Sequence, residues 1–252
     1  MQRRGNTVLI TGGASGIGLA LARALLANHN AVIICGRDEV KLQAAREALP
    51  GLVAMRADVA DPSDRARLVE RLRLEAPRLN VLVNNAGALH LCDLTSPAFL
   101  GDLDTEIGVN LVGPVALASA LLPLLRANPD PTIVNVTTGF VYVPGAYNAP
   151  YSATKAALHV MTRSLRFQLR AKNVRVVEVV PPVVDTPMAA HYDGKKETPE
   201  RVAAEIVAGL ASRRDEIVIG MSRIARVLAR VAPRFAFQMF NASAPAALAD
   251  RS

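Results

Sequence analysis

Short apolar runs alternate with longer segments of helical spacing along almost the whole chain, and this alternation limits the folds open to it. The apolar runs are short and rich in β-branched residues, which predicts strands rather than helices. Seven are expected, at residues 7–11, 31–35, 52–57, 80–83, 132–136, 174–180 and 216–219. Because nearly every position in them is apolar, both faces of the predicted sheet should be covered.

Helical spacing fills the gaps between these strands, at residues 19–27, 39–49, 104–126, 151–170 and 199–210, with another helix starting at Asp61. Residues 104–126 should tolerate Gly113 and Pro114 with some distortion. Strands that alternate with helices form βαβ units, whose strands are parallel. No repeat or linker-like stretch divides the chain. We therefore predict one α/β domain over residues 1–252, a doubly wound parallel sheet of about seven strands with helices on both faces.

The chain is basic, with a formal net charge of +7, so a nucleic-acid binder has to be considered. Its arginines are spread along predicted helices rather than clustered, and it has four tyrosines and no tryptophan for stacking on bases. These features argue against nucleic acid as a partner. A basic surface equally suits a phosphorylated cofactor or an anionic substrate.

The cysteines and the apolar segments indicate in which cellular compartment the protein resides. Cys35 lies in a predicted strand and Cys92 is the other cysteine, which favours buried thiols in a reducing compartment over a disulfide. No signal-peptide pattern follows Met1, and no window approaches the length of a charge-free membrane span. We expect a cytoplasmic protein without stable membrane insertion.

A glycine-rich turn joins the first predicted strand to the first predicted helix. It reads Thr-Gly-Gly-Ala-Ser-Gly-Ile-Gly over residues 11–18. Glycine permits positive φ and close backbone approach, and a helix N-terminus offers free N–H groups to a pyrophosphate. A tight connection without a ligand is the alternative. The place after the first strand favours a dinucleotide site made by Gly12, Ser15, Gly16, Ile17 and Gly18.

The end of the second predicted strand bears on which dinucleotide binds. NAD-binding folds usually place an acidic residue there for the ribose hydroxyls. This chain has Gly36 and then Arg37, whose guanidinium suits a 2′-phosphate. Arg37 could instead be an ordinary solvated residue, and Asp38 can cap the next helix under either interpretation. We predict NADP(H) in preference to NAD(H).

Tyr151 and Lys155 are four residues apart in a predicted helix, so they share one helix face. A tyrosine has a pKa of about 10, and a nearby ammonium lowers that pKa by favouring the phenolate. Such a pair can move a proton to a carbonyl oxygen while hydride arrives from the other side. The same spacing is common on ordinary helix surfaces, so its meaning depends on the rest of the chain.

Several motifs resemble, in order and spacing, those of the short-chain dehydrogenase/reductase family. They are the turn at 11–18, Asp58-Val59, Asn84-Asn85-Ala86-Gly87, Val109-Asn110, the strand 133–138, Tyr-Ser-Ala-Thr-Lys at 151–155, and residues 181–186. Segments 139–144, 151–159 and 178–188 look more like a bacterial subgroup that takes its name from the teichoic-acid D-alanylation operon. That name gives no substrate.

The resemblance implies a Rossmann-type fold, an oxidoreductase activity with a nicotinamide cofactor, and roles for the matching residues. Tyr151 would be the general acid/base, Lys155 would hold the nicotinamide ribose and lower the tyrosine pKa, and Asn110 would hold a water in a proton relay. Asn84 would stabilise the central strands. Asp58 and Val59 would meet the adenine, and Thr186 would touch the nicotinamide carboxamide. The remaining cofactor contacts would come from Asn85, Ala86, Gly87, Tyr151, Lys155, Pro181 and Val184. We assign no metal ligands.

The chain departs from the family pattern at two positions. Thr138 stands thirteen residues before Tyr151, where the family usually has serine. Its hydroxyl can still polarise a substrate oxygen, and its extra methyl restricts χ1. Pro182 stands where glycine is usual, and its fixed φ and missing N–H predict a different loop over the nicotinamide. The predicted catalytic residues are Asn110, Thr138, Tyr151 and Lys155.

Loops at residues 88–94, 139–150 and 187–198 are expected to surround the nicotinamide end and to form a partly apolar pocket. His90 is either a substrate contact or a solvated side chain. Residues 187–198 are predicted to be a mobile lid, with a plain surface loop as the alternative. The other candidate pocket residues are Leu89, Leu91, Phe140, Tyr142, Tyr147, Met188 and His191.

The tail, residues 221–252, interleaves apolar and basic positions. It is either an amphipathic segment for a membrane surface or a partner, or a helix packed on the domain or on a second subunit, and we favour the packed helix. The family often assembles through helices that match 104–126 and 151–170, which implies a homodimer or homotetramer.

We therefore predict an NADP(H)-dependent oxidoreductase that transfers a hydride between the nicotinamide and a carbonyl or secondary alcohol. The alternative is a cofactor-sensing binding protein that keeps the fold without turnover, and Thr138 and Pro182 are its support. The fold by itself does not name a substrate.

Overall fold

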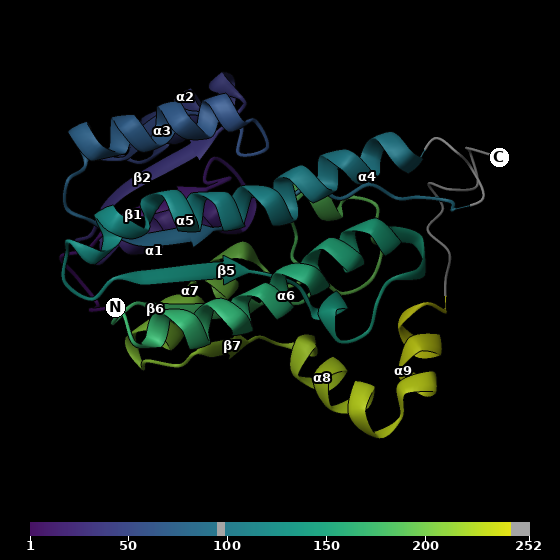
Figure 1. Ribbon diagram of the computed structural model, residues 1–252. Helices are drawn as coiled ribbons and strands as arrows, with labels where there is room; N and C mark the ends of the chain where they lie inside the picture. The colour runs from purple at the N-terminus through teal and green to yellow at the C-terminus, as the bar shows by residue number, and fades with distance from the viewer. Residues whose placement is uncertain (95–98, 243–252) are drawn as a thin grey trace.

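The computed structural model describes residues 1–94 and 99–242, and in these ranges the strands form one parallel sheet with helices on both sides (Figure 1). The strand order is β3-β2-β1-β4-β5-β6-β7, with every adjacent pair parallel. The chain order reverses between β1 and β4, where doubly wound sheets bind ligands. The predicted fold class is confirmed. The strands are β1 (Thr7–Thr11), β2 (Ala31–Gly36), β3 (Val53–Arg56), β4 (Leu79–Asn84), β5 (Thr132–Val136), β6 (Arg175–Val180) and β7 (Glu216–Val218).

Each face of the sheet has its own hydrophobic core. Because successive strand residues point to opposite faces, Val8 and Ile10 of β1 enter one core and Leu9 enters the other. The first core packs against α1 (Gly16–Ala27), α2 (Glu39–Ala48) and α7 (Pro199–Ala211). The second packs against α3 (Pro62–Glu75), α5 (Gly113–Arg126) and α6 (Ala149–Arg170). This two-sided burial explains the nearly unbroken apolar strands.

Helix starts follow the local sequence. Asp38 accepts a hydrogen bond from the Lys41 backbone N–H and caps α2, and Asp61 caps α3 just before Pro62. A side-chain oxygen at this position satisfies one free N–H of the first turn. Thr198 caps α7 in the same way. The predicted boundaries of these elements lie within three residues of the observed ones.

The predicted helix at 104–126 is wrong in detail, because it is three segments. They are α4 (Phe99–Ile107), a π-helical stretch η1 (Gly108–Val112) and α5. The distortion precedes Gly113 instead of centring on Gly113 and Pro114. A Cβ at Gly113 would lie 2.7 Å from the Val59 carbonyl oxygen, so glycine allows the helix to approach this close to the loop after β3.

The joined stretch Leu100–Arg126 is long and apolar enough to cross a membrane by length and composition. The prediction that no window approaches that length is therefore wrong. Leu117, Leu121 and Leu125 of this stretch are buried against the sheet. A helix that covers a parallel sheet needs such an apolar face, so its composition follows from the fold.

The tail contains two helices where one was predicted, α8 (Met221–Val231) and α9 (Pro233–Phe240). Pro233 starts the second helix, at a position where its missing N–H costs nothing. Both helices project from the body of the domain beyond β7 (Figure 1). Residues 243–252 of the predicted tail lie outside the described residues.

Candidate functional site

The glycine-rich turn is locked against the loop that follows β4. The Thr11 hydroxyl accepts hydrogen bonds from the backbone N–H groups of Asn85 and Ala86, each at 3.0 Å. The Asn85 amide donates to the carbonyl oxygens of Thr11 at 2.9 Å and Gly12 at 3.1 Å. Gly12 has a φ of +63°, and a Cβ there would lie 2.8 Å from the Ala86 Cα. The predicted dinucleotide residues of β1 and β4 therefore lie together.

The N-terminus of α1 is free of side-chain caps. Ser15 precedes the helix and makes no capping hydrogen bond, and the first turn has no acidic residue. Gly16 has a φ of +52°, and a Cβ there would lie 2.8 Å from Thr186 Cγ2. This cradle, which also includes Ile17 and Gly18, leaves backbone N–H groups available to an anion such as a pyrophosphate. The predicted carboxamide contact, Thr186, closes its other side.

Arg37 lies one residue beyond the end of β2 with its side chain exposed. It forms no ion pair with any residue in the described ranges, whereas the neighbouring Asp38 caps α2 and lies 3.3 Å from Lys41 Nζ. The structure confirms Asp38 as a cap. The guanidinium of Arg37 is free for an anionic ligand at the position where NAD-binding folds carry an acid.

The loop after β3 lies at the same edge of the sheet, where the parallel strands end. The Asp58 carboxylate accepts from the Ala60 N–H at 2.9 Å, and the Asp58 N–H donates to Asp64 at 2.8 Å. Val59 is buried beside it. These contacts hold the predicted adenine-binding loop in one conformation.

Three of the four predicted catalytic residues converge at the end of β5. Tyr151 and Lys155, both buried, lie in the first two turns of α6, and Lys155 Nζ lies 5.9 Å from the centroid of the Tyr151 ring. The ammonium donates to the Val136 carbonyl oxygen at 3.0 Å. The Thr138 hydroxyl lies beside the Tyr151 phenol and acts to lower its pKa. Phe140 packs edge-on against the tyrosine ring, with the ring centroids 6.3 Å apart.

Asn110, the fourth, joins the β4 loop to the catalytic helix. Its Oδ1 accepts from the Ala88 N–H at 2.9 Å, and its Nδ2 donates to the Ala88 carbonyl at 2.8 Å and to Thr154 Oγ1 at 3.1 Å. Thr154 in turn donates to the Tyr151 carbonyl oxygen at 2.9 Å. Because protein partners use both amide hydrogens, Asn110 could contact a relay water only through an acceptor oxygen.

The pKa prediction for the tyrosine is wrong for the protein without its cofactor. Burial raises the pKa of Tyr151 to about 12, against the opposing effect of the Thr138 hydroxyl. Burial also lowers the pKa of Lys155 to about 8, against the favourable charge of Glu106. The sequence places the ammonium near the phenol, but desolvation of the two enclosed groups is the larger effect.

Glu106 in α4 is a buried carboxyl that the sequence analysis missed. Its Oε1 accepts from the His90 N–H at 2.6 Å and lies 3.3 Å from His90 Nδ1. Burial raises the pKa of Glu106. His90 is neither fully solvated nor free, because this carboxyl fixes its backbone. The spacing of Glu106, four residues before Asn110, was the signal that could have found it.

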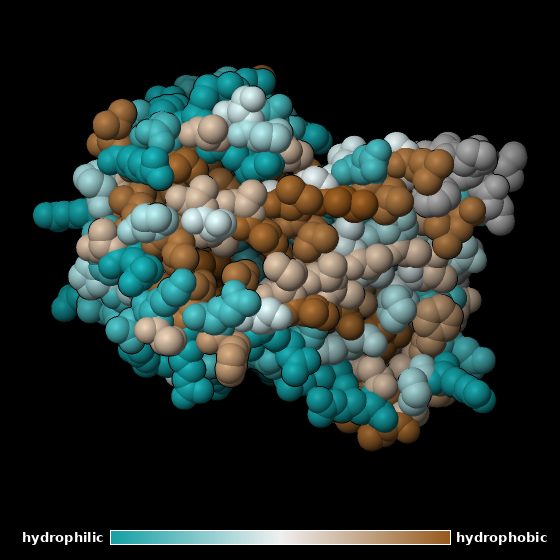
Figure 2. Space-filling view, in the orientation of Figure 1, coloured by the Kyte–Doolittle hydropathy of each residue, from teal (hydrophilic) through white to brown (hydrophobic). Residues whose placement is uncertain are grey.

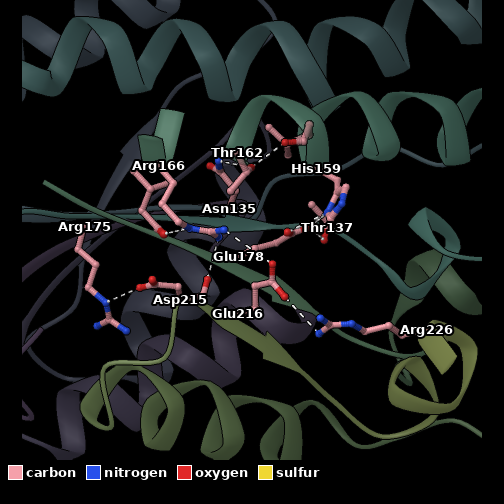
Figure 3. Close-up of polar contacts among 12 residues, drawn as sticks. Asn135, Thr137, His159, Thr162, Arg166, Arg175, Glu178, Asp215, Glu216 and Arg226 are labelled. Carbon is pink, nitrogen blue, oxygen red and sulfur yellow. Dashed lines mark hydrogen bonds and ion pairs between the residues drawn. The ribbon is translucent and has the colours of Figure 1, made fainter. Parts of the chain in front are cut away.

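Figure 3 shows a second missed carboxyl, Glu178 of β6, between the catalytic elements. Its Oε1 accepts from the Thr137 hydroxyl at 2.7 Å, and His159 Nδ1 lies 2.9 Å from both carboxylate oxygens. This contact raises the pKa of His159. Thr137 precedes Thr138, and His159 is one turn beyond Lys155. One buried carboxylate therefore ties the end of β5 to α6.

The loop after β6 is anchored at both ends. The Pro181 carbonyl oxygen accepts from the Gly139 N–H at 3.0 Å and from the Ser222 hydroxyl at 2.9 Å. Val184, which is buried, forms a bridge with Glu197, and the Asp185 N–H donates to the Glu197 carbonyl at 2.8 Å. The base of the predicted lid at 187–198 is thus fixed beside Thr186.

Comparison with known proteins agrees with this arrangement. The family model described as short chain dehydrogenase matches residues 6–197. The uncharacterized oxidoreductase DltE of Bacillus subtilis (strain 168) is 47% identical over 190 residues, 74% of each chain. Oxidoreductase UcpA of Escherichia coli (strain K12) is 34% identical over 229 residues, which cover 86% of this chain and 85% of UcpA.

Two solved structures share the fold over most of the chain. A short chain dehydrogenase from Burkholderia cenocepacia J2315 in complex with NADP has a TM-score of 0.84 and 28% identity, covering 97% of this chain and 100% of that one. The Pseudomonas aeruginosa RhlG/NADP active-site complex has a TM-score of 0.78 and 26% identity, covering 86% and 95%. The chain belongs to the short-chain dehydrogenase family and is an NAD(P)-dependent oxidoreductase acting on CH–OH or C=O groups.

Proposed function

We propose that this protein transfers a hydride between NADP(H) and a carbonyl or secondary alcohol, with Tyr151 as the general acid/base. The observation that carries this is the convergence of Tyr151, Thr138 and Lys155 at the end of β5, on the edge that holds the glycine-rich turn. The bound nicotinamide would supply or accept the hydride. The tyrosine hydroxyl would exchange the proton with the substrate oxygen.

The preference for NADP(H) is supported by charge. Arg37 is exposed at the end of β2 without an ion-pair partner among the described residues, where an acid would repel a 2′-phosphate. Structural relatives were solved with NADP. The uncapped start of α1 would hold the pyrophosphate. The remaining cofactor contacts would be Asp58, Val59, Asn85, Ala86, Gly87, Pro181, Val184 and Thr186.

The other catalytic residues have distinct roles in this proposal. Thr138 lies beside Tyr151 and would polarise the same substrate oxygen. Lys155 would hold the nicotinamide ribose with its ammonium. Asn110 would hold the loop at Ala88 against α6 and support a relay water through the η1 backbone. Burial favours the protonated phenol, which is the form that donates to a carbonyl oxygen, so the assay starts from carbonyl reduction.

The test is NADPH oxidation with a panel of aldehydes and ketones, in parallel for wild type and Tyr151→Phe. We expect wild type to consume NADPH with at least one carbonyl class and the variant to bind NADPH without consuming it. If wild type binds NADPH and reduces none of the panel, the cofactor-sensing function replaces the catalytic one. Absence of binding to either cofactor would refute both.

We also propose self-association through the outer face of α4, η1, α5 and α6, as a homodimer or homotetramer. Val112, Val160 and Phe167 expose 44%, 59% and 84% of their surfaces there. Apolar side chains along these helices are visible in Figure 2. A hollow of about 500 Å³ lies on α6 between Val160 and Phe167. Sedimentation velocity of wild type against Phe167→Asp should show a loss of the assembly.

A cytoplasmic location is part of the same proposal. Cys35 and Cys92 are free and buried, and burial raises the pKa of the Cys35 thiol to about 12. Such thiols are packing residues with little thiolate, as suits a reducing compartment. Separating secreted proteins from intact expressing cells would test the location, and we expect the protein in the cells.

A further inference from the structure

The two tail helices bury small side chains and expose large apolar ones. Ser222, Ala225 and Ala236 are the buried residues of α8 and α9. The large apolar side chains that stay 41% to 72% exposed are Met221, Ile224, Val227, Val231, Phe235, Phe237 and Met239. A helix that packs on its own domain shows the opposite distribution. Packing on the domain therefore explains the helix face that carries small side chains. It does not explain why the large apolar side chains are exposed.

The exposed face is held in a fixed position. The Ser222 hydroxyl donates to the Pro181 carbonyl at 2.9 Å, and the Asn241 amide donates to the Pro144 carbonyl at 3.0 Å. Asn241 Oδ1 also accepts from the Ala146 N–H at 2.6 Å. Figure 2 shows apolar side chains at the lower edge of the molecule, where Figure 1 places α8. The apolar face therefore points outward from helices that are tied to the loops beside the active site.

The charge of the tail has one sign. Residues 217–242 contain no Asp or Glu and carry Arg223, Arg226, Arg230 and Arg234. The first two pair with carboxylates of the domain, at 2.7 Å and 3.2 Å. Arg230 and Arg234 form no salt bridge within the described ranges. The exposed apolar surface is thus accompanied by uncompensated positive charge.

We propose that the α8–α9 surface, residues 221–240, docks the protein on an anionic lipid bilayer. An amphipathic helix with an apolar face and flanking arginines lies in the plane of the interface, with its apolar side chains among the acyl chains. Basic side chains near anionic headgroups strengthen this attachment. A second copy of the chain fits less well, because a twofold contact would bring two sets of arginines together without acidic partners.

The experiment is flotation of the full chain with phosphatidylcholine vesicles, with and without phosphatidylglycerol. We expect wild type to float with the anionic vesicles and to stay in solution with the neutral ones. Replacing Arg230 and Arg234 by alanine should weaken the partition to anionic vesicles by about tenfold or more. Val227→Gln with Val231→Gln and Phe235→Gln should abolish flotation while leaving the charge unchanged. All five positions are outside the catalytic and cofactor residues.

Matched controls distinguish docking by the α8–α9 surface from nonspecific binding to vesicles. Val40→Gln with Leu74→Gln removes apolar side chains that are 79% and 81% exposed on other helices, and Arg46→Ala with Arg126→Ala removes two exposed arginines elsewhere. Both controls should float like wild type. Equal flotation with neutral vesicles, or equal loss in the controls, would overturn the proposal. So would sedimentation showing that the apolar triple variant dissociates a lipid-free oligomer, because the face would then belong to a second copy.

Discussion

The nucleotide end and the catalytic end of the same sheet edge differ in how their polar groups are used. At the nucleotide end, Arg37 is exposed and unpaired within the described residues, and the start of α1 lacks a side-chain cap. At the catalytic end, the polar atoms of Lys155 and Asn110 already bond to protein partners. The polar groups of the first end are therefore available to a ligand, whereas those of the second end are hydrogen-bonded within the protein.

This difference predicts that the first end determines cofactor affinity and that the second end determines turnover. Free donors at the surface bind an anion without having to break protein contacts first, so changes there should alter affinity. Buried, hydrogen-bonded groups keep their geometry but have pKa values moved by desolvation, so changes there should alter turnover and its pH dependence. Variants at the two ends should therefore affect different measured quantities.

The largest expected effect belongs to Tyr151→Phe. Removing the hydroxyl takes away the proposed proton donor and leaves the ring packed against Phe140, so turnover should fall by about 10²- to 10⁴-fold. The NADPH dissociation constant should change by less than about twofold, because the groups proposed to bind the pyrophosphate and the 2′-phosphate lie at the other end. Steady-state kinetics and fluorescence titration measure the two quantities. Retained turnover would remove Tyr151 from the mechanism.

Arg37→Ala should come next, with an effect on binding alone. Loss of a charge-assisted contact to the 2′-phosphate should weaken NADPH by about 10- to 100-fold and leave NADH unchanged. Lys41→Ala is the matched control, since Lys41 is an exposed cation nearby that already pairs with Asp38. Calorimetric titration of both cofactors gives the result. An equal loss of affinity for NADPH and NADH would mean that Arg37 does not bind the 2′-phosphate.

Glu178→Gln should affect stability in a pH-dependent way. The raised pKa of His159 means that the Glu178 contact stabilises the fold fully below the unfolded histidine pKa, about 6.5, and loses that contribution as pH rises through the folded value. The variant should therefore be less stable by about 1–3 kcal/mol at low pH, with a smaller difference at alkaline pH.

Denaturant unfolding at several pH values measures this difference. Glu205→Gln is the control, because Glu205 pairs with arginines at the surface and contacts no histidine in the described structure. A stability difference between wild type and Glu178→Gln that stays constant across pH would show that the His159 contact is not its source.

Thr138→Ser should have the smallest effect. Serine keeps the hydroxyl beside Tyr151 and loses one methyl, so turnover should stay within about fivefold of wild type. Thr138→Ala removes the hydroxyl, so its turnover should fall clearly further than that of Thr138→Ser. Kinetics of the two variants side by side decide the matter. Equal losses would assign the role of this position to packing by the methyl rather than to the hydroxyl.

Apart from the fold class, the features predicted correctly from the sequence are local ones. The strands follow from apolar runs, and the turn at Gly12 and Gly16 follows from positions that need positive φ. Tyr151 and Lys155 lie together because four residues make one helical turn. Each of these patterns depends on neighbours within a few residues, so the sequence displays it directly.

The missed features depend on contacts between separate segments. His159 and Glu178 come from α6 and β6, and His90 and Glu106 come from a loop and α4. Their signals are an acid inside an apolar strand and an acid one turn before Asn110. The tyrosine pKa was mispredicted for the same reason, because spacing shows that Lys155 is near Tyr151 but not how deeply both are buried.

Deuteride transfer tests most directly whether the cofactor bound at one end reduces a substrate held at the other end. NADPH deuterated at C4 of the nicotinamide would be incubated with each member of a panel of aldehydes and ketones, and any alcohol formed would be examined by mass spectrometry and NMR. We predict deuterium on the carbinol carbon with wild type, and at least about 10²-fold slower labelling with Tyr151→Phe. Bound NADPH that transfers no deuterium to any carbonyl compound would contradict hydride transfer and leave a cofactor-binding protein.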